Sequence, residues 1–252
     1  MQNAFVYICD GTAEGLLSCI YESYYSGENV YDITRDENFQ KSLLLNYRHI
    51  DVDFDSAQKV AYSIRSKISR HAFDNIIKTW LSELPMCGHY ILEYVRLGYI
   101  AKSGIHNMLT HDTVAFVESA VYKVEREVHR FLGLCRFSKA HDNTYVCRIS
   151  PDHNILPLIA DHFAARMQTE RLVIYDEKRV KAVLCDMGQW IMINGTPLSD
   201  VVLSEEEYLF RKMWQKYFES ISIKERTNKK LQRSFIPTRY WKNITELKDE
   251  GF

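Results

Sequence analysis

Several features common in other protein classes are scarce or missing in this sequence. Its 252 residues include 10 glycines and 5 prolines, so long disordered linkers are not expected. It has no run of 18 apolar residues, which argues against a transmembrane helix. Its first residues lack a basic region followed by an apolar stretch, so we expect no signal peptide. These absences predict a cytoplasmic chain that does not act in a membrane.

Closely spaced cysteines are also missing. The six cysteines are scattered, and no two of them have the C-x-x-C spacing. Zinc sites and iron–sulfur clusters normally use clustered Cys or His ligands, so the spacing predicts no metal site, and we expect no cofactor. Scattered cysteines without an export signal indicate free thiols in a reducing compartment.

Familiar catalytic motifs are absent too. The sequence contains no G-x-S-x-G elbow, Walker loop, zincin motif or kinase signature. The chain is nevertheless 46% hydrophobic, which is enough for the core of one large domain or of two closely packed ones.

Charge is distributed unevenly along the chain, although the net charge is only −1. Residues 1–58 carry ten acidic and three basic side chains, a balance of −7. Residues 208–242 carry ten Lys or Arg against two Glu, a balance of +8. Basic groups neutralise phosphates, so the second segment predicts contact with nucleic acid. A charged face that is merely solvated is the alternative.

The spacing of apolar residues predicts an α+β fold. In the N-terminal half, residues 4–9 are typical of a buried strand, residues 30–33 of a short strand, and residues 13–25 and 55–102 of helices. Residues 112–132 repeat valine at three- and four-residue steps, which predicts the clearest helix. Beyond Gly133 we expect a helix opening at 151, a helix at 204–220, and strands at 134–137, 145–149, 172–175, 180–186 and 189–193. The expected result is an antiparallel sheet of about five strands packed by helices, with the first strand a candidate for the same sheet.

Two arginines form the first group that could carry chemistry. Arg130 lies near the end of the long helix, and Arg136 lies on the strand expected after it. Together they could clamp a phosphate in bidentate fashion. Ion pairs with Glu125 or Glu127 are the alternative.

A second group combines histidines with charged residues. His162 and Arg166 are four positions apart and share a helix face. With His153 and Asp176 they could line a pocket that acts on a nucleotide or a damaged base, because histidine transfers protons near neutral pH. A satisfied buried histidine and a simple type I turn at Asp176 are the alternatives.

The basic segment 208–242 also contains aromatic residues. Trp214, Tyr217 and Phe218 fit one buried helix face, whereas Tyr240 and Trp241 could either anchor the C-terminal segment or stack on bases. The predicted nucleic-acid contacts beyond Arg130 and Arg136 are Arg179, Arg226, Asn228, Lys229, Lys230, Arg233 and Arg239, together with Tyr240 and Trp241.

Five ordered motifs resemble those of a known family. They are His129-Arg-Phe-Leu-Gly-Leu-Cys-Arg-Phe137, Pro151-Asp-His-Asn-Ile-Leu continuing to His162-Phe-Ala-Ala-Arg166, Leu172-Val-Ile-Tyr-Asp-Glu-Lys-Arg179, Trp214-Gln-Lys-Tyr-Phe218 with Glu225-Arg-Thr-Asn228, and Pro237-Thr-Arg-Tyr-Trp-Lys242. The family is the bacterial "probable DNA metabolism protein" group, whose main domain is also fused to some uracil-DNA glycosylases. Residues 85–246 carry the detailed resemblance, and the opening residues 6–17 resemble the family's N-terminus.

The resemblance implies a role but not an activity. It implies a DNA-repair or DNA-modification protein that works with a radical-SAM partner, whose own cysteines would hold the iron–sulfur cluster. It also implies a division into an N-terminal strand and helical region, residues 1–84, and a family domain, residues 85–252. The acidic residues 1–58 could dock the partner or shield the basic face. An enzyme using the His/Arg pocket and a non-catalytic structural subunit are the two alternatives.

Overall fold

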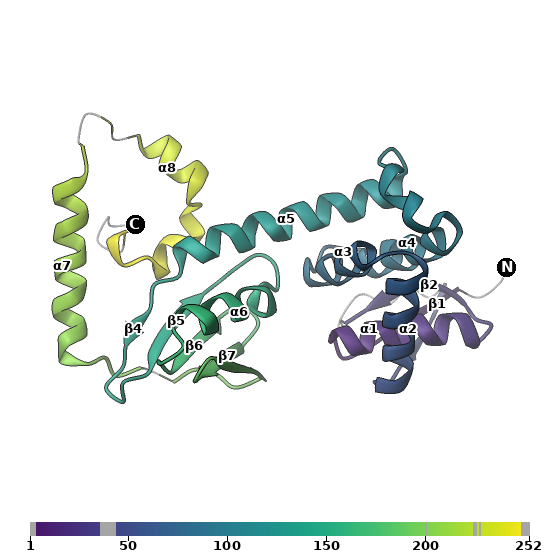
Figure 1. Ribbon diagram of the computed structural model, residues 1–252, viewed down its shortest axis with the longest axis horizontal. Coiled ribbons are helices and arrows are strands. Elements are labelled where there is room, and N and C mark those ends of the chain that lie inside the picture. Colours follow the sequence, from purple (N-terminus) through teal and green to yellow (C-terminus); the bar gives the residue numbers. More distant parts are fainter. Residues whose placement is uncertain (1–3, 36–43, 200, 224–225, 227, 248–252) are drawn as a thin grey trace. The chain divides into compact units, whose positions relative to one another are not determined.

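The computed structural model describes residues 4–35, 44–199, 201–223, 226 and 228–247. The chain forms two compact units, Met1–Val124 and Glu125–Phe252, which we call unit 1 and unit 2. Figure 1 shows the order of the elements along the chain.

Unit 1 contains a small parallel sheet. Its strand order is β2-β1-β3, with β1 at Ala4–Ile8, β2 at Asn29–Thr34 and β3 at Leu45–His49. Helix α1 (Ala13–Tyr25) connects β1 to β2 and begins at Thr12, whose side chain accepts a hydrogen bond from the backbone of Gly15. The first strand and its helix are therefore confirmed. The strand belongs to this separate sheet, however, and β3 lies in a segment for which the sequence predicts no strand.

Helices in unit 1 pack against this sheet and against one another. Helix α4 (Cys87–Ala101) packs close to β2: the Nδ1 atom of His89 lies 2.7 Å from the carbonyl oxygen of Tyr31, and Arg96 donates a hydrogen bond to the carbonyl of Val30 at 3.0 Å. Trp80 is buried in the core and donates to the carbonyl of Gly11 at 3.0 Å. The elements after β3 are α2 (Phe54–Lys67), α3 (Arg70–Leu81), α4 (Cys87–Ala101) and the short 3₁₀ helix η1 (Lys102–Asn107).

The long helix α5 (Asp112–Leu134) follows η1 and continues into unit 2. Val114, Val117, Val121 and Val124 are all buried. Their spacing produces one apolar face along the helix, so the helix predicted at 112–132 is confirmed.

Unit 2 is built on a five-stranded sheet with the order β4-β5-β6-β7-β8. The strand bounds are β4 (Ser138–Lys139), β5 (Tyr145–Ile149), β6 (Leu172–Asp176), β7 (Lys181–Asp186) and β8 (Gln189–Asn194). The expected sheet of about five strands packed by helices is confirmed, with two differences. The strand predicted at 134–137 is wrong, because α5 continues to Leu134 and the first strand of the sheet is β4. Strands β5 and β6 are parallel, and the other neighbours are antiparallel. Helix α6 (Leu156–Arg166) makes the crossover that a parallel pair requires.

Helix α7 (Glu205–Ile221) presents its aromatic side differently from our prediction. Trp214, Tyr217 and Phe218 are 42%, 54% and 36% exposed, so the expected buried aromatic face is wrong. The reason is that hydrogen bonds of polar side chains, rather than burial of these rings, attach the helix to the rest of unit 2. The carboxylate of Glu207 accepts from the backbone of Lys139 at 3.1 Å, and Arg211 donates to the hydroxyl of Ser138 at 2.6 Å.

The C-terminal elements are short. They are α8 (Lys229–Phe235) and the 3₁₀ helices η3 (Thr238–Asn243) and η4 (Thr245–Leu247). Across both units, no helix among the described residues is both long enough and apolar enough to span a bilayer.

Candidate anion-binding groove

A buried carboxylate organises the C-terminal segment of unit 2. Glu127 is 3% exposed, and its two oxygens accept hydrogen bonds from the backbone amides of Asp152 at 2.7 Å and His153 at 2.8 Å. The hydroxyl of Tyr240 donates to the same carboxylate. We call these four residues the Glu127 network. It ties the turn at Pro151 and the helix η3 to α5.

The two aromatic residues of η3 are anchors. Tyr240 and Trp241 are 3% and 5% exposed. The indole of Trp241 donates to the carbonyl of Ile236 at 2.8 Å, and the ring of Tyr240 packs edge-on against Phe131. The sequence left two roles open for these residues, anchoring the C-terminal segment and stacking on bases. This arrangement corresponds to the anchoring role.

Asp176 and Arg179 form an ion pair inside unit 2. Asp176 is fully buried, and Arg179 donates to its carboxylate at 2.8 Å. Burial raises the pKa of Asp176, although the guanidinium acts in the opposite direction. Arg179 also donates to the carbonyls of Pro151 and Asp152. Both residues therefore hold the turn before α6.

The proposed His/Arg pocket residues occupy different surroundings. His162 and Arg166 are exposed on α6, whereas Asp176 is buried and His153 is half-buried with its amide held by Glu127. None of these four residues lines the groove described next.

A groove of about 410 Å³ lies in unit 2. Three guanidinium groups line it, from Arg136 after α5, Arg148 on β5 and Arg211 on α7. The remaining lining residues are Ser138, Val146, Val201, Leu203, Asn243 and Thr245. We call this the arginine groove. Three arginines around one solvent-accessible hollow are suited to an anion.

The three arginines differ in how far the protein already engages them. Arg136 forms a two-point pair with Glu246, with distances of 2.6 and 3.2 Å. Arg211 donates to Glu207 at 2.9 Å as well as to Ser138. Arg148 donates to the carbonyl of Ser199 at 3.2 Å.

The side chain of Arg148 lies 4.0 Å from Glu177, and Glu177 is also held by Lys242 at 2.8 Å. A guanidinium has five N–H donors. Arg148 therefore keeps the most donor capacity for a ligand.

Sequence reasoning singled out Arg136 but missed Arg148 and Arg211. Arg148 sits in the apolar strand 145–149 as its one charged residue, which was the available signal. Arg148 and Arg211 line the same groove because α7 returns to the sheet. Residue spacing does not reveal this return. Arg130 is half-buried on α5 and does not line the groove.

The predicted contacts around α8 are mostly at the surface. Arg226, Lys230 and Arg233 are exposed, and we call them the α8 cations. Asn228 is exposed as well, and its side chain accepts from the backbone of Leu231 at 2.9 Å, which caps α8. The side chain of Lys229 lies outside the described residues. Arg239, also exposed, is engaged by Asp152 and lies over the ring of Tyr240 at 4.7 Å.

The ion pair between Arg136 and Glu246 predicts a loss of stability in acid. Burial alone would raise the pKa of Glu246, but hydrogen bonds from Arg136 and Trp214 outweigh it and hold the pKa below its usual 4.5. A lowered pKa means that the stabilisation is complete above the usual value and disappears as pH falls through the folded-state value. We expect the urea midpoint of unit 2 to drop more between pH 7 and about pH 3 in the wild type than in Glu246→Gln. Equal drops in the two proteins would contradict this role of Glu246.

Comparison with known proteins identifies the chain only at the level of a domain. A family model described as a domain of unknown function, DUF4130, matches residues 85–246, which is more than half of the chain. No curated protein matches. The match begins where we placed the start of the second domain, whereas the two compact units divide later, within α5.

Proposed function

Because the chain belongs to the family defined by the domain of unknown function DUF4130, we propose its function from its own surface: it binds nucleic-acid phosphates. DNA is the expected form, since the sequence motifs resemble those of a DNA-metabolism group. The observation that carries the proposal is the arginine groove, in which Arg136, Arg148 and Arg211 line one hollow. The α8 cations add exposed positive charge in the same unit.

Within the groove, Arg148 is the residue that we expect to contact a phosphate directly. Its nearest carboxylate is 4.0 Å away and is shared with Lys242. Arg136 and Arg211 have closer acidic partners. We therefore expect them to position the phosphate and to set the local electrostatic potential. The segment 208–242, with a balance of +8, supplies the long-range attraction that raises association rates.

A fluorescence-anisotropy titration with labelled single- and double-stranded oligonucleotides tests the proposal. The full chain is titrated at about 50 and about 200 mM salt, because each neutralised phosphate contributes a slope of about −0.9 in log affinity against log salt. We expect Arg148→Ala to weaken binding by about tenfold at low salt and to reduce the salt slope by about 1. A pair of substitutions, Arg226→Ser with Lys230→Ser, is expected to reduce the slope by about 2.

The matched control is Arg171→Ala. Arg171 is 71% exposed in unit 2 and does not line the groove, so its removal should cost little. Absence of binding at the lower salt concentration would overturn the proposal. So would equal effects of Arg148→Ala and Arg171→Ala on affinity and slope.

A radical-SAM partner is a second part of the proposal and is supported by the resemblance alone. The acidic N-terminal residues, with a balance of −7 over 1–58, are the segment that we propose for docking it. Repeating the titration with the partner present would reveal a mutual effect on DNA affinity. An unchanged affinity at saturating partner would argue against coupled binding.

A further inference from the structure

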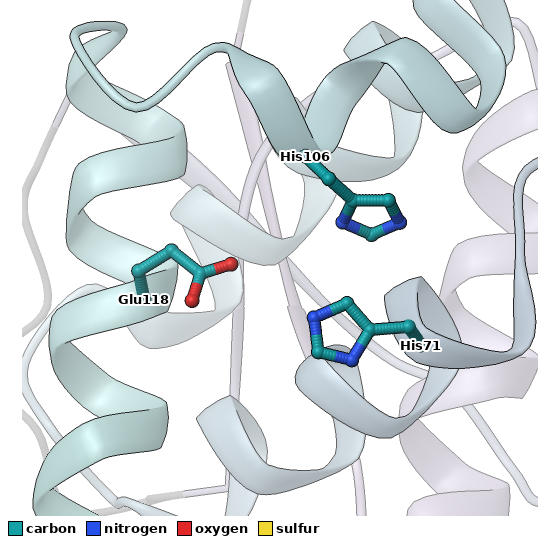
Figure 2. A group of neighbouring side chains, drawn as sticks. All are labelled: His71, His106 and Glu118. Atoms are coloured by element: carbon teal, nitrogen blue, oxygen red, sulfur yellow. The ribbon is translucent and has the colours of Figure 1, made fainter.

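Two histidines and a glutamate converge in unit 1, from three elements that are distant in the sequence. His71 lies at the start of α3, His106 in η1 and Glu118 on α5. Figure 2 shows the three side chains pointing toward one another. One ligand atom from each lies within 4.8 Å of the other two. Two imidazoles and a carboxylate form a donor set that suits divalent transition metals, zinc in particular.

The ring of His106 is oriented by its neighbours. Its Nε2 atom lies 2.8 Å from the hydroxyl of Ser69, and that hydroxyl oxygen also accepts from the backbone of Ala72 at 2.9 Å. With Nε2–H donating to Ser69, the Nδ1 atom presents a lone pair. Nδ1 is buried and has no hydrogen-bond partner among the described residues. A buried acceptor without a partner costs free energy, and a metal ion would satisfy it.

The two histidine rings lie 4.7 Å apart at their centroids, with 53° between their planes. Ring packing by itself leaves the buried Nδ1 atom unsatisfied.

Glu118 is held from the protein interior. Asn75 is fully buried, and its side-chain amide donates to Oε1 of Glu118 at 2.9 Å. Metal ligands are commonly oriented by such outer hydrogen bonds. Ser69 and Asn75 therefore take the supporting positions around the two half-buried ligands.

We propose that His71, His106 and Glu118 bind one zinc ion, with water in the fourth position. His71 is exposed, so solvent reaches the proposed site and the imidazole ring of His71 can rotate. Tetrahedral zinc with bonds near 2.0–2.1 Å brings its ligand atoms to about 3.4 Å from each other. Binding should therefore draw His71 inward and cross-link α3, η1 and α5. This site lies in unit 1 and is independent of the proposed nucleic-acid binding by unit 2.

The test is a zinc titration of the chelator-treated full chain by calorimetry, with Co²⁺ as a visible probe of tetrahedral coordination. We expect one equivalent to bind and the thermal midpoint to rise. Loss of an outer hydrogen bond typically lowers metal affinity about 10–100-fold, which is the expected range for Ser69→Ala. His71→Ala and Glu118→Gln remove ligands and should lower the affinity by more than about 100-fold.

The control is His141→Gln, which removes an exposed histidine from a turn in unit 2. It should bind zinc as the wild type does. His71→Ala is the decisive variant because its side chain is exposed and its loss should not disturb folding, which circular dichroism would check. Wild-type affinity in both His71→Ala and Glu118→Gln would overturn the proposal, as would the absence of stoichiometric binding to the wild type.

Discussion

Replacing Glu127 by alanine is expected to destabilise unit 2 by about 3 kcal/mol or more. The substitution removes the acceptor for two backbone amides and one tyrosine hydroxyl. Each buried donor left without a partner costs about 1–3 kcal/mol. Since domains are typically stable by about 5–15 kcal/mol, unit 2 should lose a large part of its stability.

The measurement uses urea unfolding of 5-fluorotryptophan-labelled protein followed by fluorine NMR. Three of the four tryptophans, Trp190, Trp214 and Trp241, lie in unit 2, and Trp80 lies in unit 1. The midpoints of the unit 2 tryptophans should fall in Glu127→Ala. Trp80 serves as the internal reference.

Two companion variants separate the network from a general helix effect. Glu125→Ala changes an exposed residue of the same helix and should shift stability by no more than about 0.5 kcal/mol. In a Tyr240→Phe background, Glu127→Ala should cost less, because one of the three donors is already gone. A loss below about 1 kcal/mol in Glu127→Ala alone would contradict the role that we assign to the Glu127 network.

The elements with strong periodicity could be predicted from the sequence. Strand β6 at Leu172–Asp176 and helix α5 have uninterrupted apolar patterns, and both were predicted within a few residues. Strand β3 was missed because its residues, Leu45–His49, are half-buried or exposed and carry no apolar alternation. Helix α8 has only seven residues, too few for its period to be recognised.

The candidate sites were harder to predict than the fold. The arginine groove depends on polar contacts of Glu207 and Arg211 that attach α7, whereas the apolar spacing of this helix predicts a packed aromatic face. The cluster of His71, His106 and Glu118 involves no local motif, because its members are brought together only by the packing of three elements. We predicted no metal site from the spacing of the cysteines. That spacing carries no information about a cluster of two histidines and a glutamate.

Replacing Gly88 by alanine is expected to destabilise unit 1 by about 2 kcal/mol or more. Gly88 is the second residue of α4, and a Cβ atom added there would lie 1.9 Å from the carbonyl oxygen of Ile33 on β2. Backbone atoms cannot move aside as a flexible side chain would. The helix and the strand must therefore separate, which also strains the contact of Arg96 with Val30. Alanine's better helix propensity returns only about 0.5–1 kcal/mol.

Gly133→Ala is the matched control for this prediction, because an added Cβ on that helical glycine meets no heavy atom within 4 Å. It should be neutral or stabilising by up to about 1 kcal/mol. In the fluorine NMR experiment, Gly88→Ala should lower the urea midpoint of Trp80, a core residue of unit 1, with Trp241 as the reference. An unchanged Trp80 midpoint would mean that α4 does not approach β2 as closely as Gly88 permits.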